Sequence, residues 1–114
     1  MAKLPPETLE AIWNLLKQLS QVVEDAKFAE FTLFDRFGET NSTISNLGDL
    51  SNVAEEAASQ YLHLANLRLR IAEAQPNTSV DMLRLLEQVI TQNQLRIPAM
   101  KRSIEEIKIE WNLP

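Results

Sequence analysis

The last third of the chain carries an unbroken series of mostly apolar residues in alternating steps of three and four. The series is Leu83, Leu86, Ile90, Asn93, Ile97, Met100, Ile104, Ile107 and Trp111. Such spacing keeps side chains on one side of an α-helix along its whole length. It therefore predicts a long helix that packs lengthwise against other helices, with Asn93 as the one polar residue in its seam.

The first third of the chain follows the same rhythm. Its series is Leu9, Ile12, Leu16, Leu19, Val23, Ala26, Glu30, Leu33 and Phe37. We expect a helix over residues 6–37, because proline suits a first turn and Gly38 suits a stop. A break near residues 25–27 is an alternative, and a strand over the Phe-Thr-Leu-Phe stretch is a third choice. Glu30 is expected to be exposed because the helix would bend or end before it.

A second helix is expected over residues 50–74. Residues 38–49 are rich in turn and cap formers, so they predict a loop, with a short helical turn around residues 44–47 as an option. Asp49, Ser51 or Asn52 would cap the helix. Two adjacent, mostly apolar stripes run along it: Leu50, Ala54, Ala57, Tyr61, Leu64, Arg68 and Ile71, and then Ala58, Leu62, Ala65, Leu69 and Ala72. Together they cover roughly 200° of the helix, more than the roughly 100° that one buried face requires.

The third helix is expected over residues 79–112, with Pro98 in its interior. Thr78 or Ser79 would cap its start. An interior proline removes one backbone hydrogen bond and costs about 3 kcal/mol. The seam nevertheless keeps its phase on both sides of Pro98, which favours one kinked helix over two separate helices.

Three long helices joined by short connections must run antiparallel, up-down-up, so the sequence predicts a single all-α domain over residues 1–114. This arrangement resembles the architecture of spectrin-type three-helix repeats. It brings the phenylalanines at the end of the first helix close to Ile107 and Trp111 at the end of the third. Our first interpretation of that aromatic end is core packing, and the alternative is an exposed apolar patch.

Composition excludes several classes of chemistry. The chain has no cysteine, one histidine (His63) and two glycines, so it lacks the residues for a disulfide framework, a histidine zinc site or a phosphate-binding loop. We therefore predict no enzyme activity, no metal and no cofactor. A net charge of −5 disfavours binding to nucleic acid or an anionic membrane. The absence of a secretory signal and of an apolar run of roughly 20 residues predicts a soluble, cytoplasmic protein.

Each predicted seam contains one polar or charged residue: Glu30, Arg68 and Asn93. At 1.5 Å per residue their levels along the bundle differ by about 12 Å, so we expect three separate features rather than one site. Asn93 is interpreted as a residue that specifies register or oligomeric state.

Arg68 lies within the apolar arc of the second helix, where an unpaired guanidinium would be costly. It is expected to extend toward solvent, or to pair with Glu7 or Glu10, and stacking on Trp13 is compatible with either.

Long seams, broad apolar faces and missing catalytic chemistry predict a non-enzymatic helical-bundle module for protein interaction or assembly. Its partner would be another protein or a second copy of the chain, as in a homodimer. The candidate interaction residues are Leu62, Leu69, Phe28, Phe31, Phe34, Phe37 and Arg68. The alternative is a small-molecule-binding regulatory bundle in which Arg68 and Trp13 hold an anionic ligand.

Overall fold

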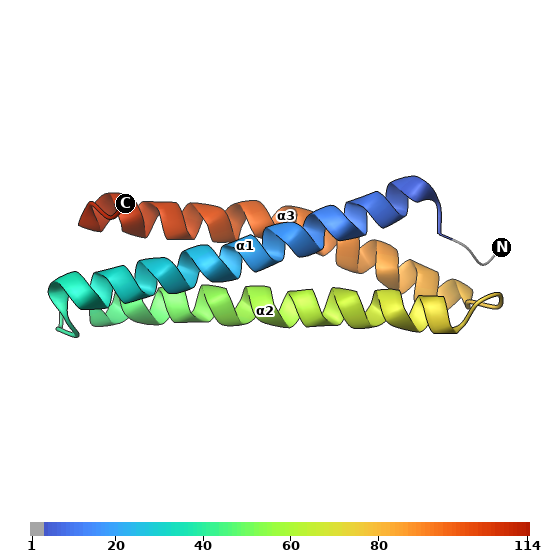
Figure 1. Cartoon of the computed structure of the whole chain (residues 1–114), viewed down its shortest axis with the longest axis horizontal. Coiled ribbons are helices and arrows are strands. Elements are labelled where there is room, and N and C mark those ends of the chain that lie inside the picture. Colours follow the sequence, from blue (N-terminus) through green and yellow to red (C-terminus); the bar gives the residue numbers. More distant parts are fainter. Residues whose placement is uncertain (1–3) are drawn as a thin grey trace.

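Three long helices make up the computed structural model, which describes residues 4–114 (Figure 1). They are α1 (Pro6–Phe37), α2 (Ile44–Glu73) and α3 (Val80–Trp111). Successive helices run antiparallel and every pair is in contact, which confirms the predicted all-α, up-down-up bundle. The molecule is elongated, with extents of 55 × 19 × 16 Å. Within the described residues, no helix is apolar enough over its length to cross a membrane.

The helix α1 is continuous over the predicted range, so the alternatives of a break near residues 25–27 and of a strand are wrong. Its buried face differs from the predicted seam, because Val22 and Ala29 are buried whereas Val23 and Glu30 are only half-buried. Val22 and Ala29 follow Leu15 in steps of seven, and Leu15 lines a small pocket with Ile97 and Pro98 of α3, so this flank of α1 lies toward α3. Glu30 lines a pocket with Leu47 and Ser51 of α2, and Val23 lies seven residues before Glu30, so this flank lies toward α2.

The helix α2 begins at Ile44, earlier than predicted, so the loop spans only residues 38–43. Thr40 and Thr43 order the turn that leads into α2 through reciprocal hydrogen bonds, and the Thr40 carbonyl accepts from the Ile44 N–H at 2.9 Å. The Thr43 N–H donates to Thr40 Oγ1 at 3.2 Å, and the Thr40 N–H donates to Thr43 Oγ1 at 2.9 Å. The buried Thr43 hydroxyl also donates to the carbonyl of Gly38 at 2.7 Å. The predicted caps Asp49, Ser51 and Asn52 therefore lie inside the helix.

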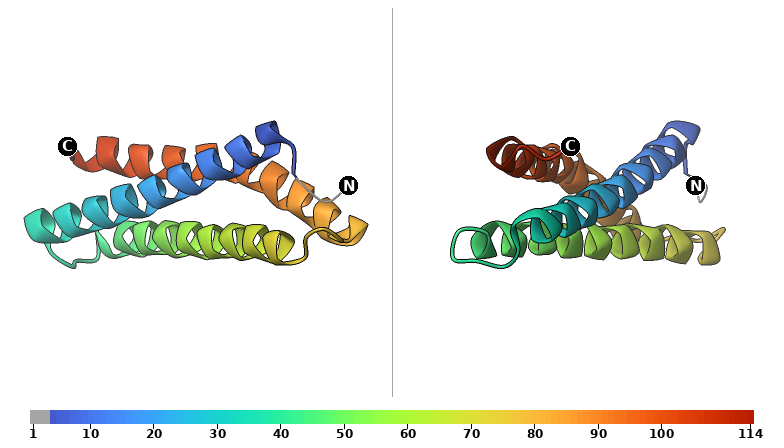
Figure 2. Two further views of the ribbon diagram at one scale, coloured as in Figure 1. Left: turned by 45° about the vertical axis from the view of Figure 1, so that its right-hand side comes forward. Right: turned by 60° about the vertical axis from the view of Figure 1, so that its left-hand side comes forward.

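The helix α3 starts where the sequence predicted, with Ser79 as its N-cap and the Ser79 hydroxyl accepting from the Met82 N–H at 3.1 Å. It continues through Pro98 to Trp111, which confirms one helix rather than two. Figure 2 shows α3 changing direction near its middle, as expected where proline removes a helical hydrogen bond. Asn112 then ends the helix in the left-handed conformation, with φ of 53°.

The core is aliphatic and runs the length of the bundle. Its apolar members are Ile12, Leu15, Leu16, Leu19, Val22, Ala26, Ala29 and Leu33 from α1; Leu50, Ala54, Ala57, Leu64, Leu67 and Ile71 from α2; and Leu86, Val89, Ile97, Met100, Ile104 and Ile107 from α3. None of the four phenylalanines belongs to this core. Burial of these aliphatic side chains is the main force that holds the helices together.

Candidate interaction surface

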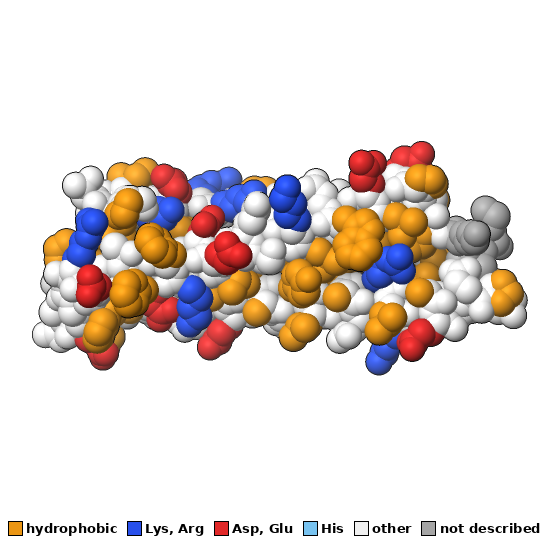
Figure 3. Space-filling view, in the orientation of Figure 1, with side chains coloured by type: hydrophobic (Ala, Val, Ile, Leu, Met, Phe, Trp, Pro, Cys, Tyr) orange, Lys and Arg blue, Asp and Glu red, His pale blue; other side chains and the backbone are white. Residues whose placement is uncertain are grey.

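One side of the bundle exposes large apolar side chains from both α1 and α2 (Figure 3). Residues seven apart lie on the same side of a helix. On α1 one such series is Trp13, Ser20, Lys27 and Phe34, and Phe31 lies beside it. On α2 the series is Ile44, Ser51, Ala58, Ala65 and Ala72, and Leu62 and Leu69 lie beside it. These residues define the α1/α2 face. Its six large apolar side chains are each 53–65% exposed, unlike the core.

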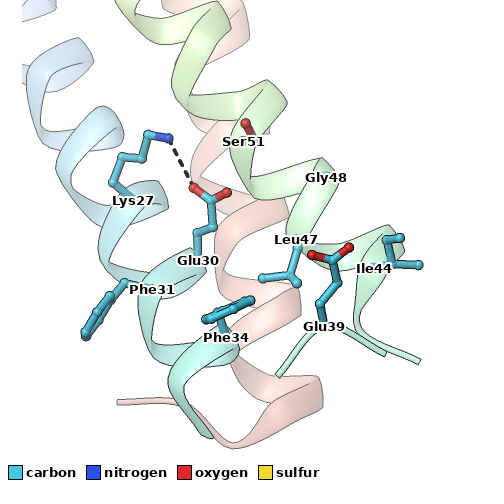
Figure 4. Close-up of a pocket in the computed structure, with 9 residues that line it drawn as sticks. All are labelled: Lys27, Glu30, Phe31, Phe34, Glu39, Ile44, Leu47, Gly48 and Ser51. Carbon is cyan, nitrogen blue, oxygen red and sulfur yellow. Dashed lines mark hydrogen bonds and ion pairs between the residues drawn. The ribbon is translucent and has the colours of Figure 1, made fainter. Parts of the chain in front are cut away.

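An open groove of about 530 Å³ lies between α1 and α2 at the end of this face that adjoins the 38–43 loop (Figure 4). Its lining residues are Lys27, Glu30, Phe31, Phe34, Glu39, Ile44, Leu47, Gly48 and Ser51. Phe34 points toward Leu47 across the groove, whereas Phe31 points outward from α1. The groove is therefore mainly apolar, with charged groups at its rim.

The aromatic end of α1 differs from our first interpretation. Core packing was expected, but Phe28, Phe31, Phe34 and Phe37 are all 45–65% exposed. Residues spaced by three progress around the helix, and the inward positions at this level are taken by Ala26, Ala29 and Leu33. One part of the prediction is confirmed, because the rings of Phe37 and Trp111 lie 5.1 Å apart between centroids.

Trp13 and Arg68 mark the opposite end of the α1/α2 face. The Arg68 guanidinium lies over the indole of Trp13, 5.6 Å from the ring centroid, an arrangement with which the sequence was compatible. Within the described residues, no ion pair joins Arg68 to Glu7, Glu10 or any other carboxylate. Its Nε is buried without a hydrogen-bond partner there. Arg68 is thus a cation that the described part of the chain does not neutralise.

Glu30 lies in the groove, where Lys27 Nζ contacts its carboxylate at 3.2 Å. The expectation that Glu30 would be exposed because α1 bends or ends before it is wrong, since α1 continues to Phe37 and Glu30 is half-buried. Half-burial against α2 and the contact with Lys27 account for its position. Glu30 and Arg68 lie at opposite ends of the face, and Asn93 lies inside the core, so the three residues do not form one site.

Asn93 is 1% exposed. Its Nδ2 donates to the Val89 carbonyl of the same helix at 3.0 Å. Within the part of the chain that the structure describes, its Oδ1 has no hydrogen-bond partner. The amide therefore makes no hydrogen bond to another helix among these residues, and its role in register or oligomeric state stays a prediction.

A charged pair that the sequence did not predict joins α2 to α3. Arg96 donates from Nε and from Nη2 to the two carboxylate oxygens of Glu56, both at 2.7 Å. These hydrogen bonds, together with the positive charge, lower the pKa of Glu56 below its usual value, and they raise the pKa of Arg96. No local pattern couples residues on different helices, so no sequence signal pointed to this pair.

No group of three or more histidine, aspartate or glutamate side chains is arranged to hold a metal ion within residues 4–114. His63 is exposed on α2. The fold and the surface together define an antiparallel three-helix bundle with an exposed apolar face. Comparison of the chain with protein-family models, curated proteins and solved structures finds no match.

Proposed function

We propose that this protein is a non-enzymatic helical-bundle module that acts by binding another protein chain through the α1/α2 face. The supporting observation is that its six large apolar side chains are gathered over two helices and are each more than half exposed. Single exposed apolar residues are common on protein surfaces, but a group of this kind is typical of interaction sites. Tryptophan and phenylalanine are also enriched in the cores of interfaces.

The energetic reason is the removal of this apolar surface from water. Full burial of a large apolar side chain contributes about 1.5–3 kcal/mol, and association must offset the loss of translational and side-chain freedom. Several such side chains on one face can supply that surplus, whereas a single one cannot. The groove beside Phe31 and Phe34 adds a concave place where a partner side chain can be buried.

The test combines light scattering at several protein concentrations with the fluorescence of a dye that binds apolar surface. We expect the wild-type chain either to associate or to bind the dye. The double variant Phe34→Ser, Leu69→Ser should reduce both signals. Leu95→Ser is the matched control, because Leu95 is 73% exposed on α3, away from this face.

Two results would contradict the proposal. One is a strict monomer that binds no dye at any concentration. The other is a Leu95→Ser variant that lowers association and dye fluorescence as much as the double variant does.

A second candidate is a regulatory bundle that binds a small anionic ligand at Arg68 and Trp13. It is supported by the stacking of the guanidinium on the indole and by the lack of a carboxylate partner among the described residues. Thermal-shift measurements with a panel of small carboxylates and phosphates test it. Stabilisation that is lost in Arg68→Gln would support the idea, and equal behaviour of both proteins would count against it.

A further inference from the structure

We infer that the partner on the α1/α2 face is a second copy of this chain, docked antiparallel about a two-fold axis that crosses the face near Val23 and Ala58. This inference rests on the proposed function and adds the identity and orientation of the partner. In a two-fold interface the same surface serves both copies, so each contact occurs twice.

The register between α1 and α2 places the axis. Trp13 contacts Arg68 at one end, and Phe34 shares the groove with Leu47 at the other. Val23 and Ala58 lie midway between these two levels. A two-fold axis that lies in the plane of the face at this level, perpendicular to the helices, places α1 of one copy against α1 of the other. It places α2 against α2 in the same way, and each pair of helices is antiparallel.

This exchange places Trp13 of each copy over the groove of the other, near Phe31 and Phe34. The groove of about 530 Å³ is open and exceeds the volume of an indole ring. A large aromatic side chain buried in a concave apolar pocket is the usual centre of binding energy in an interface. Because the interface is symmetric, it would contain this insertion twice.

The shape of the middle of the face is compatible with close approach. Most of the bulky side chains occur at its two ends, whereas the small residues Ser20, Ser51, Ala58 and Ala65 lie between them, with Leu62 as the one large apolar side chain near the axis. Small residues allow the backbones of facing helices to come near each other, which is needed for a side chain at either end to reach the opposite groove. Lys27 is already paired with Glu30 on its own chain.

Charge favours the antiparallel arrangement over the parallel one. Arg68 makes no ion pair within residues 4–114, and neither does Glu39, which lines the groove at the other end. Antiparallel docking brings Arg68 of one copy toward Glu39 of the other. Parallel docking would bring the two Arg68 side chains to one end and the two Glu39 side chains to the other, and like charges in a desolvated interface are unfavourable.

The size of the face is sufficient for a stable dimer. The whole side of the bundle that carries the face measures 55 × 19 Å, which sets an upper limit on the order of 1,000 Å² for the surface that one copy can bury there. Specific protein interfaces bury roughly 800 Å² per partner. This limit exceeds the usual area, so a dimer of the usual size fits on this side of the bundle.

Spin-label distances test the orientation, and the absence of cysteine in the chain makes single labels straightforward. Asn41→Cys places a label in the 38–43 loop, and Asn77→Cys places one at the opposite end of the bundle. The antiparallel dimer predicts a long Asn41-to-Asn41 distance, close to the 55 Å length of the molecule. It also predicts a long Asn77-to-Asn77 distance. In a mixed dimer, with one chain labelled at residue 41 and the other at residue 77, it predicts a short distance between the two labels. A parallel dimer reverses all three results and would overturn the inference.

Substitutions test the contacts. Trp13→Ser should weaken the dimer by about 30-fold or more, as expected for a central aromatic residue, whereas Leu95→Ser should leave it unchanged. Arg68→Glu and Glu39→Arg should each weaken dimerisation, and combining them should restore it. Trp13 is more than half exposed, so its substitution is compatible with folding, and circular dichroism checks this.

The outcomes separate this inference from the proposed function. A monomer that still binds apolar dye through the α1/α2 face would overturn the dimer and support binding of a different protein. A monomer without dye binding would overturn both. A dimer that is insensitive to Trp13→Ser and to Phe34→Ser would show that another surface associates, which overturns the inference.

Discussion

Replacement of Asn93 by leucine is expected to stabilise the protein. Asn93 is 1% exposed, and within the described residues its Oδ1 accepts no hydrogen bond. A buried acceptor without a partner costs its full desolvation free energy, which is about 1–3 kcal/mol. Leucine has the same branched shape but no polar atoms, so Asn93→Leu removes this cost.

The magnitude follows from three contributions. Removing the unsatisfied oxygen gains about 1–3 kcal/mol, and burial of apolar groups in its place adds about 0.8 kcal/mol per methylene equivalent. Loss of the Nδ2 hydrogen bond to the Val89 carbonyl destabilises the variant by about 1 kcal/mol. The loss is no larger because that carbonyl still accepts the backbone hydrogen bond of the helix. Because the methyl groups are larger than the amide atoms, some of this gain is lost to crowding. The expected net effect is about 2 kcal/mol of stabilisation.

Thermal unfolding monitored by circular dichroism provides the assay. For a chain of 114 residues, an unfolding entropy of about 2.1 cal/mol/K per residue converts about 2 kcal/mol into a rise in Tm of about 8 °C. Measurements at several concentrations separate this shift from any stabilisation by association. Gln92→Leu, at an exposed position of the same helix, is the control and should change stability by less than about 0.5 kcal/mol. A lower Tm for Asn93→Leu would refute the reasoning, because it would mean that Oδ1 is satisfied in solution.

Three further predictions concern the charged pair, two glycines and a buried threonine. A double-mutant cycle on Glu56 and Arg96 should give a coupling of about 0.5–1 kcal/mol at neutral pH, since both side chains are partly exposed. Because the folded-state pKa of Glu56 is lowered, this coupling is present above the unfolded-state pKa near 4.5 and is lost as pH falls through the folded value. Gly48→Ala should stabilise α2 by about 1 kcal/mol, because a Cβ added at residue 48 meets no atom within 4 Å. Gly38→Ala should destabilise the protein by about 1–3 kcal/mol, because the backbone φ of Gly38 is 72°. Urea unfolding of the two variants measures both effects. Thr43→Val should cost about 1–3 kcal/mol in the same assay, since the buried hydroxyl bonds both Gly38 and Thr40, and an unchanged midpoint would contradict that role.

The sequence predicted the helices well where the signal is local and repeated. The bounds of α1 agree with those predicted, and α3 agrees to within a residue at each end. Proline at the start of α1, Gly38 at its end and Ser79 before α3 act on their own turns, so their effect needs no knowledge of the fold. The continuity of α3 through Pro98 was predictable for a similar reason. The spacing of apolar residues keeps the same register before and after Pro98, which indicates one helix with one buried face.

The predicted start of α2 was too late. The turn before α2 depends on a pair of threonines, Thr40 and Thr43, that hydrogen-bond to each other. Neither Thr40 nor Thr43 is distinctive alone, and the segment is rich in other cap formers. Gly48 also suggested a loop, although glycine is tolerated inside a helix at a cost of about 1 kcal/mol. The reciprocal hydrogen bonds between the two threonines order the turn from which α2 starts.

The amino-acid sequence by itself determined the number of helices, their up-down-up order and the aliphatic character of the seam. The reason is that the spacing of apolar residues within each segment indicates the buried face of that helix without reference to the others. Only the tertiary structure decided which apolar side chains remain outside. A helix with a broad apolar arc does not specify which flank the third helix will cover. Packing of α3 against the flank of α1 that carries Val22 and Ala29 left Trp13, Phe31 and Phe34 exposed beside α2, and it brought Arg96 to Glu56.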